Sequence, residues 1–158
     1  MKEISITIPY YKTLTLHHIV LDYNGTLAKD GLLKTEAKTL LEPLCKRLKV
    51  HVITSDTFGT VEKQLEGFDV TIKVLMSEDH TMEKALYLGE LTDDTCVAVG
   101  NGNNDAQMLE NAALGIALIG DEGCSTKTLM SSDIVCHCIG DALGLLLNDK
   151  RLVATLRK

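Results

Sequence analysis

The stretch HHIVLDYNGT (17–26) joins a short apolar run to a polar turn, and this pattern recurs along the chain. Its apolar part is rich in Ile, Val and Leu and lacks the period-two alternation of a half-exposed strand, which favours a strand covered on both faces. Similar runs follow at 50–56, 70–75, 96–100, 115–120 and 134–138, and another strand is predicted at about 3–8. Such runs are typical of a parallel sheet buried between helices.

Amphipathic stretches fill the intervals between the predicted strands. They predict helices at about 35–48, 57–66, 80–91, 104–112, 124–130 and 140–148. Strand and helix alternate through the chain, which implies right-handed crossovers and an α/β fold with a doubly wound, Rossmann-like parallel sheet. The chain has 158 residues and shows no repeat or linker, so we expect residues 1–158 to form a single domain.

The charge and composition exclude several classes of partner. Sixteen basic and 22 acidic residues give a net charge of −6, which repels the phosphates of nucleic acid. The chain has no Trp, two Phe and four Tyr, too few aromatic rings for base stacking. No apolar run approaches the roughly 18 residues of a membrane span, and the N-terminal stretch lacks the apolar centre of a secretory signal. We therefore expect a cytoplasmic protein that binds neither nucleic acid nor membranes.

Cysteine usage points to the same compartment. The five cysteines are odd in number and irregularly spaced, which favours free thiols in a reducing compartment over disulfides. They are Cys45, Cys96, Cys124, Cys136 and Cys138. The segment Cys136-His137-Cys138 raises the alternative of a soft-metal site. On a strand, however, the two thiols lie on one face and the imidazole on the other, so the better interpretation is a core strand with buried thiols.

Two other features have ordinary interpretations. His17 and His18 open the predicted strand that ends at Asp22, so we expect them to be partly buried and without a catalytic role. The last ten residues are basic through four side chains, Lys150, Arg151, Arg157 and Lys158. A frayed, solvated helix end explains them. The alternative is a tail that reaches the site of a neighbouring subunit.

Polar residues follow three of the predicted strands, at Asp22 to Thr26, Thr54 to Asp56, and Gly100 to Asp105. One such turn is usually a helix N-cap or a tight turn. In a doubly wound sheet, however, ligands bind beyond the carboxyl ends of the strands, at the point where the winding reverses. Three polar strand ends in one sheet therefore indicate a functional site.

Asp22 is the candidate for the central residue of that site. A carboxylate at the end of a buried strand can attack a phosphoryl group when a cation neutralises the charge between them. Mg²⁺ prefers oxygen ligands and keeps several waters. The Asp22 carboxylate, the Asn24 backbone carbonyl and an oxygen from residues 101–105 would supply those ligands.

Two further groups would complete a phosphate site. Thr54, or Ser55 beside it, offers a hydroxyl close to the backbone N–H groups that open the next helix. Lys84, early in the helix before the 96–100 strand, would bridge the phosphate and Asp22 as a fixed positive charge. The alternative for Lys84 is a solvated helix face.

The order and spacing of these segments resemble the four motifs of the haloacid dehalogenase (HAD) superfamily. The motifs are Asp22 to Leu27, the strand that ends at Thr54, Lys84, and Gly100 to Asp105. Within them, TSD (54–56) and GNGNNDAQMLENAALGIAL (100–118) are similar to the TGD and GDGxND segments of P-type ATPases. The chain thus resembles the small soluble proteins of the P-type-ATPase-like subgroup.

This resemblance implies a role for each motif residue. Asp22 would be the phosphorylated nucleophile, Thr54 the phosphate-binding hydroxyl and Lys84 the charge stabiliser. Asp105, together with Asn104, would lie at the magnesium end of the site.

Two positions depart from the superfamily pattern. Asn24 stands where these phosphatases usually carry the Asp that acts as general acid and base, and Asn101 stands where they usually carry a magnesium-binding Asp. Each change removes a negative charge and weakens metal binding, although the Asn101 amide oxygen still offers a ligand. An amide cannot transfer a proton, and general acid–base catalysis contributes about 10²–10⁴ in rate, so hydrolysis is expected to be slow.

The intervals between the motifs leave no room for a cap domain. Predicted core strands and helices fill both intervals, and only a flap at residues 28–31, a predicted β-hairpin turn, fits between them. Since it shows neither membrane segments nor a nucleotide-binding insertion, the chain is not expected to be an ion pump. An open site suits a large substrate, or a homo-oligomer in which a neighbouring subunit forms the lid.

Two functions remain open. The first is a Mg²⁺-dependent phosphohydrolase or phosphotransferase that acts through an aspartyl-phosphate on a phosphorylated small molecule or on a macromolecular phosphate. The second is a binding or regulatory module that kept the HAD fold and lost turnover through Asn24 and Asn101. The sequence favours the enzyme.

Overall fold

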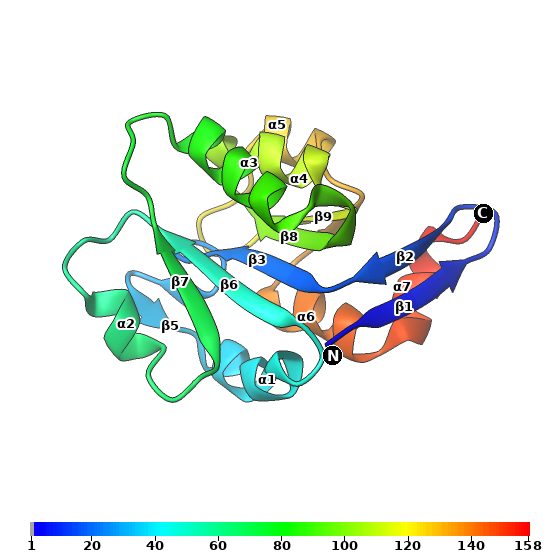
Figure 1. The fold of residues 1–158 in the computed structure, drawn as a ribbon, viewed down its shortest axis with the longest axis horizontal. Helices are drawn as coiled ribbons and strands as arrows, with labels where there is room; N and C mark the ends of the chain where they lie inside the picture. Colours follow the sequence, from blue (N-terminus) through cyan, green and yellow to red (C-terminus); the bar gives the residue numbers. More distant parts are fainter. Residues whose placement is uncertain (1) are drawn as a thin grey trace.

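A six-stranded parallel sheet forms the centre of the computed structural model, which describes residues 2–158 (Figure 1). The strands are β3 (His18–Asp22), β6 (Lys49–Thr54), β7 (Val70–Val74), β8 (Cys96–Gly100), β9 (Leu114–Leu118) and β10 (Ile134–Cys136). They lie in the order β10-β9-β8-β3-β6-β7. The chain therefore winds outward from β3 in one direction and then returns to start again at β8, which confirms the doubly wound α/β fold and puts its switch point between β3 and β8.

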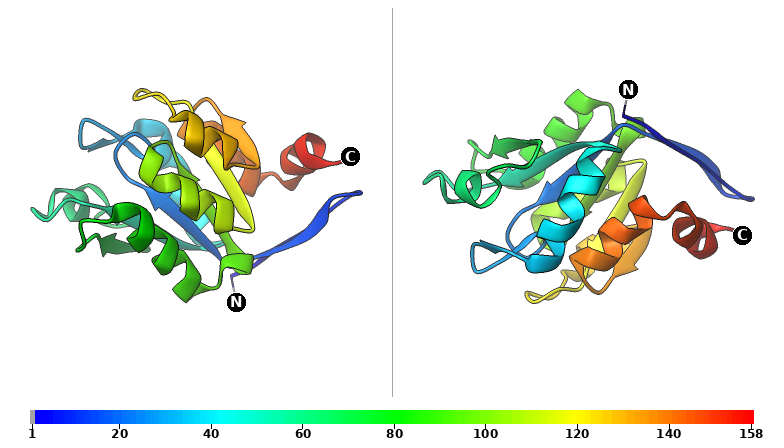
Figure 2. Two further views of the ribbon diagram at one scale, coloured as in Figure 1. Left: turned by 90° about the horizontal axis from the view of Figure 1, so that it is seen from above. Right: turned by 90° about the horizontal axis from the view of Figure 1, so that it is seen from below.

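Helices cover both faces of this sheet, which is why its strands read as continuous apolar runs (Figure 2). One face carries α1 (Thr35–Cys45) and α6 (Ile139–Leu147), and the other carries α3 (His80–Leu91), α4 (Ala106–Asn111) and α5 (Thr126–Met130). Along β3, Ile19 and Leu21 pack into the core on the α1 and α6 side, whereas Val20 packs into the core under α3 and α4. The predicted 80–91 helix has the predicted bounds. The short α2 (Thr60–Gln64) lies next to β7 and covers less than the predicted 57–66.

The predicted flap is a small antiparallel hairpin of β4 (Ala28–Lys29) and β5 (Leu32–Leu33). Asp30 and Gly31 form its turn with φ angles of 51° and 84°, as a two-residue hairpin turn requires. Within residues 2–158 the hairpin and α2 are all that stands over the carboxyl edge between β3 and β7, and no cap domain is inserted there.

A second hairpin, β1 (Ile4–Ile8) with β2 (Lys12–Leu16), projects from the sheet together with α7 (Asp149–Leu156) (Figures 1 and 2). The predicted fraying of the C-terminal helix is wrong, because α7 packs against β1 and buries Leu152 completely. The four basic side chains of the last ten residues are exposed to solvent, as predicted. The backbone N–H of Lys158 also donates to the Pro9 carbonyl at 3.1 Å. Tertiary contacts thus hold the basic tail against the hairpin, at the end of the sheet away from Asp22.

The predicted 134–138 strand ends early, at Cys136. Cys136 is buried as expected, but Cys138 is only half-buried and serves as the N-cap of α6, where its Sγ accepts from the Asp141 N–H at 3.4 Å. All five cysteines are free thiols. His137 is exposed, so the segment does not form a three-ligand site.

In the part of the chain described here, no helix is long and apolar enough to cross a membrane.

A buried histidine on β6 links folding stability to pH. His51 is 6% exposed, and its ring nitrogens lie 3.0 Å from Nδ1 of His18 and 2.8 Å from the Tyr87 hydroxyl. Burial, together with the smaller effects of the neighbouring His18 and Lys49, lowers the pKa of His51 from 6.5 to about 4. The unfolded chain therefore binds a proton at this position at a higher pH than the folded chain does.

We expect the free energy of unfolding to fall as the pH drops from 6.5 towards 4, by up to about 3 kcal/mol from His51 alone. The slope of stability against pH in urea unfolding should be shallower in His51→Gln. His137→Gln serves as the matched control because that side chain is exposed. An unchanged slope in His51→Gln would show that this imidazole does not couple folding to pH.

Candidate active site

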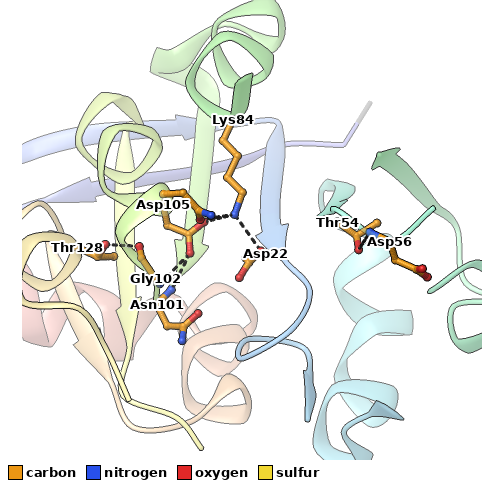
Figure 3. A network of polar contacts seen from close by, with 9 residues as sticks. Asp22, Thr54, Asp56, Lys84, Asn101, Gly102, Asp105 and Thr128 are labelled. Carbon is orange, nitrogen blue, oxygen red and sulfur yellow. Dashed lines mark hydrogen bonds and ion pairs between the residues drawn. The ribbon is translucent and has the colours of Figure 1, made fainter. Parts of the chain in front are cut away.

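Lys84 connects the polar ends of the two central strands (Figure 3). Its Nζ lies 3.0 Å from Oδ1 of Asp22 at the end of β3, and 2.7 Å from Oδ1 of Asp105, which follows β8. It also donates to Oδ1 of Asn104 at 2.8 Å. The structure therefore brings together side chains that are up to 83 positions apart in the printed sequence, at the switch point where a doubly wound sheet binds ligands.

The solvated-face interpretation of Lys84 is wrong, because this side chain is 3% exposed. The N-cap Asp79, which accepts from the Met82 N–H at 3.0 Å, starts α3 so that Lys84 points towards the sheet edge (Figure 3). Burial opposes the ammonium charge, but the carboxylates of Asp22 and Asp105 outweigh it and raise the pKa of Lys84. The ammonium is thus a fixed positive charge at neutral pH.

Asp105 is completely buried, and protein donors occupy both of its oxygens. Oδ1 accepts from Lys84, and Oδ2 accepts from the backbone N–H groups of Asn101 and Gly102 at 3.0 and 3.1 Å. The approach is so close that a Cβ at Gly100 would lie 2.4 Å from the Asp105 carboxyl group. Glycine at this position lets the carboxylate fold back under the loop, where it holds Lys84 and the 101–102 backbone in place.

Asp22 has a carboxylate whose charge is not fully compensated. Burial and the nearby Asp105 raise its pKa to about 7, while Lys84 and the backbone N–H of Tyr23 oppose that rise. Lys84 occupies Oδ1. A raised carboxyl pKa marks a place where a further cation would be stabilising, because the cation would favour the charged form.

The two asparagines at the site are both tied to the backbone. The exposed Asn24 accepts from the Gly31 N–H through Oδ1 at 3.2 Å, so it braces the flap turn. Asn101, 8% exposed, donates from Nδ2 to the Gly123 carbonyl at 3.1 Å and lies against Gly25. The two bonds differ in direction, since Asn24 is the acceptor in one and Asn101 the donor in the other.

Thr54 lies on the side of Asp22 away from Asn101 and Asp105 (Figure 3). Its Oγ1 accepts from the Asp56 N–H at 3.0 Å, which leaves the hydroxyl proton available for another acceptor. Asp56 in turn accepts from the N–H groups of Phe58 and Val61 and fixes the turn before α2. Ser55 is exposed at the same strand end.

Sequence reasoning missed two supporting contacts. The Tyr23 hydroxyl donates to the Gly31 carbonyl at 3.0 Å and so adds a second bond between the flap and the residues after Asp22. The buried Thr128 on α5 donates to the Gly102 carbonyl beside Asp105. Neither bond could be predicted from a local sequence pattern, because Gly31 lies eight residues from Tyr23 and Gly102 lies 26 residues from Thr128.

The donor set suits a hard divalent cation. Among residues 2–158, no three His, Cys, Asp or Glu side chains gather in a metal-binding group. Magnesium needs fewer, because it usually binds through one or two carboxylates and keeps several waters. The Asp22 carboxylate, with its raised pKa, supplies the charge, and the Asn24 carbonyl and the Asn101 amide oxygen are hard ligands at the same edge.

The Lys84 ion pairs can be tested through stability. Lys84→Met leaves the buried Asp105 and the half-buried Asp22 without their shared counter-charge, and removing one partner of a buried ion pair costs about 3–5 kcal/mol. We expect a loss of that size in urea unfolding of the metal-free protein at pH 7. Lys84→Met combined with Asp105→Asn should recover part of it, because one carboxylate is gone. Equal stability of Lys84→Met and wild type would contradict the described contacts.

Comparison with known sequences gives two relatives, while no family model matches the chain. An uncharacterised protein of Methanocaldococcus jannaschii is 62% identical over 61 residues, which cover 39% of this chain and 66% of that protein. A copper-exporting P-type ATPase of Staphylococcus saprophyticus is 30% identical over 149 residues, which cover 92% of this chain and 18% of the ATPase. The chain thus spans just under two thirds of one relative and less than a fifth of the other.

Solved structures resemble nearly the whole chain. A 3-deoxy-D-manno-octulosonate 8-phosphate phosphatase from Moraxella catarrhalis, in complex with magnesium, phosphate and the octulosonate, has a TM-score of 0.69 at 16% identity and covers 90% of this chain and 94% of its own. A protein from Legionella pneumophila assigned to the HAD superfamily of hydrolases has a TM-score of 0.71 at 16% identity, with 89% and 87% covered.

The strand order, the switch-point site and these likenesses define the class: the chain has the fold of the HAD superfamily, in its form without a cap. Along almost its full length its sequence is also similar to a segment of a copper-exporting P-type ATPase. That similarity agrees with the TSD and GNGNND segments at the ends of β6 and β8.

Proposed function

We propose that this protein is a phosphohydrolase or phosphotransferase that depends on a divalent metal, Mg²⁺ in the first place, and forms an aspartyl-phosphate on Asp22. The observation that carries the proposal is the buried contact of Lys84 with both Asp22 and Asp105 at the switch point. The HAD fold and the phosphatases among the solved structures that share it support the same class of reaction. We also propose that residues 1–158 act as one catalytic domain on a phosphorylated small molecule or on a macromolecular phosphate.

In the proposed reaction an oxygen of Asp22 attacks phosphorus, and the bond from phosphorus to the leaving-group oxygen breaks. Lys84 and the Thr54 hydroxyl stabilise the non-bridging oxygens from opposite sides of Asp22, as fixed donors do for developing charge. Asp105 is a positioning residue, because it holds Lys84 and does not need to touch the phosphate. Water or an acceptor hydroxyl then takes the phosphoryl group and frees Asp22.

Asp22, the Asn24 carbonyl and the Asn101 amide oxygen would hold the metal, with Asp105 behind them in contact with Lys84 and the loop. When bound, the metal would neutralise charge between the carboxylate and the phosphate. The leaving-group oxygen must still acquire a proton, and Asn24 cannot supply one. Asn24 also cannot act as the base that activates water, so hydrolysis of the phosphoenzyme is expected to be the slower step, and the phosphoenzyme should last longer than in an enzyme with a carboxyl group at this position.

A binding or regulatory module is the alternative, and one observation favours it. The amides of Asn24 and Asn101 are both engaged in backbone contacts, with Gly31 and Gly123, that brace the flap and the loop after β9. At position 101 asparagine therefore has a structural use that does not depend on turnover, because an aspartate could not donate to Gly123, whereas an aspartate at position 24 could accept the same bond from Gly31.

A direct test is phosphate release from a panel of phosphomonoesters with and without Mg²⁺. Trapping with beryllofluoride, which mimics a phosphoryl group on a carboxylate, separates a competent nucleophile from one that has lost its function. Metal-dependent release together with a beryllofluoride adduct at Asp22 supports the enzyme. An adduct without release leaves a phosphotransferase or a switch, and the loss of both leaves only the binding module.

Magnesium should also stabilise the folded protein. A ligand that binds only the folded state at about 100 times its Kd adds about 2.7 kcal/mol, which corresponds to a rise in Tm of about 5–10 °C for a chain of this size. The rise should be absent in Asp22→Asn, which removes the charged ligand. A wild-type Tm that is unmoved by saturating Mg²⁺ would exclude these residues as a magnesium site.

A further inference from the structure

Two adjoining cavities lie beside the candidate active site, between α2, β7 and the flap. The larger, of about 370 Å³, is lined by Thr54 and by residues of the segment 56–62 and of β7. The smaller, of about 220 Å³, is lined by Asn24, Gly31 and part of the same segment. Asp56 and Val61 line both cavities. Because the two cavities share Asp56 and Val61 and reach Thr54 and Asn24 of the candidate site, we call them together the trough.

The trough combines an apolar surface with negative charge. Val61, Ile72 and Val74 give the larger cavity its aliphatic lining. Two acidic side chains, Asp56 and Glu62, line the larger cavity, and neither cavity is lined by a Lys or Arg. Its lining therefore repels a leaving group that carries a carboxylate or a second phosphate.

Among the side chains of this lining, Glu62 offers a ligand a negative charge and Phe58 offers it an aromatic ring. Both oxygens of Asp56 already accept from backbone N–H groups, at 2.9 and 3.2 Å. Glu62 is exposed and has no ion-pair or hydrogen-bond partner among its neighbours in the described chain. Phe58 lines the larger cavity and is 92% exposed, so its ring is free to contact a ligand. A carboxylate and an aromatic ring over aliphatic side chains are the groups that recognise an organic cation.

We propose that this trough binds the leaving group of the substrate and that this leaving group is an amino alcohol. Its alkyl part would cover Val61, Ile72 and Val74, and its ammonium group would lie by Glu62 and Phe58. The inference rests on the proposed function, since it names the substrate class of that same site. It assigns substrate selection to the segment 56–62, which supplies no reacting group.

The first test compares two substrates of matched shape and different charge with a smaller, anionic ester. Choline phosphate, its uncharged isostere 3,3-dimethylbutyl phosphate and the anionic 2-phosphoglycolate are assayed for kcat/KM with Mg²⁺. We expect choline phosphate to exceed the uncharged ester by about threefold to tenfold, as an exposed to half-buried ion pair gives, and 2-phosphoglycolate to be the poorest. The preference should shrink at 1 M salt. Turnover of the uncharged ester without a preference for the cation would overturn the inference and leave the proposed function standing.

The second test uses Glu62→Gln, which removes the charge and keeps the shape. It should abolish the preference for choline phosphate, by lowering kcat/KM for choline phosphate to the value for 3,3-dimethylbutyl phosphate. Glu66→Gln is the matched control, because Glu66 is also exposed, lies four residues further on and does not line either cavity. Equal effects of the two variants would show that general surface charge, not the trough, sets the preference.

A third measurement does not depend on turnover. Choline phosphate is titrated into the metal-free protein while backbone amide signals are followed by NMR. We expect the largest shifts at Thr57, Phe58 and Glu62, with affinity lower for 3,3-dimethylbutyl phosphate and for Glu62→Gln. Shifts confined to other parts of the chain, or equal affinity for the charged and uncharged esters, would refute the trough as the amino-alcohol site even if the protein proves to have no phosphatase activity.

Discussion

Phosphate release and phosphoenzyme formation are expected to fall by about 10⁴-fold or more in Asp22→Asn, the usual scale for loss of a catalytic nucleophile. The change is isosteric, and the amide oxygen of the variant can still accept from Lys84. It removes the carboxylate that we propose as the nucleophile. A phosphate-release assay and rapid-quench labelling with a phosphomonoester measure the two signals separately.

Asp30→Asn is the control for this prediction. Asp30 lies in the exposed flap turn, has a positive φ that asparagine tolerates well, and loses the same charge without touching the site. Its activity should equal that of the wild type. Asp22→Asn should also be slightly more stable than wild type without metal, because the pKa of about 7 shows that the Asp22 charge is disfavoured there. Activity retained in Asp22→Asn would remove this residue from the mechanism.

The central sheet and the candidate site could be predicted from the sequence because the patterns that indicate them are local. Each buried strand carries its own apolar run, and each polar strand end follows directly from it, as in HIVLD before Asn24. Parallel strands then bring those ends to one edge whatever the details of packing. For this reason the strand ends at Asp22, Thr54 and 100–105 could be predicted to meet, and Lys84 to reach them from the helix before β8, while the roles of the single residues followed from the resemblance to the HAD superfamily.

The elements that sequence reasoning missed depend on contacts made far along the chain. The α7 helix has a thin apolar stripe, with Leu152 fully buried, and it is held by β1. The sequence KTLTL of β2 alternates polar and apolar residues, as a half-exposed strand does. Only one residue separates β2 from β3, so the boundary between the two strands is not visible in the sequence. The bonds from Asn24 to Gly31 and from Asn101 to Gly123 are equally hidden, since a side-chain amide gives no sign of its partner in the sequence.

The hydrogen bonds of Asn24 and Asn101 also determine how well the protein should tolerate aspartate at these two positions, where the HAD superfamily usually carries it. Asn24 accepts its bond from Gly31, so the carboxylate of Asn24→Asp can accept the same bond and keep the flap in place. Asn101 donates to the Gly123 carbonyl, and an aspartate cannot donate. Asn101→Asp therefore breaks a contact and places a carboxylate beside a carbonyl oxygen. We expect the single change at Asn24 to be well tolerated, and Asn24→Asp with Asn101→Asp to bind Mg²⁺ more tightly but to be less stable without it.

Steady-state turnover should rise in Asn24→Asp, towards the gain of about 10²–10⁴ that a positioned acid–base group provides. The new carboxyl group lies two residues after Asp22, where it can protonate the leaving oxygen and then activate water. Asn103→Asp is the matched control, because Asn103 is exposed on the loop after β8 and gains the same charge without being a candidate for proton transfer. A similar rise in that control would assign the effect to charge alone.

Rapid-quench measurement of the phosphoenzyme shows which step limits the wild type. If proton transfer is the missing element, the wild type gives a burst of labelled Asp22 followed by slow decay, and the decay accelerates in Asn24→Asp. If the chain is a phosphotransferase, the burst remains, but its decay depends on an added acceptor and changes little in the variant. If neither protein gives a burst while a known HAD phosphatase does so under the same conditions, Asp22 is not phosphorylated and the binding module is the remaining function. Each outcome follows from the chemistry at one position, because Asn24→Asp changes the proton-transfer capacity of the site and leaves the Asp22, Lys84 and Asp105 contacts intact.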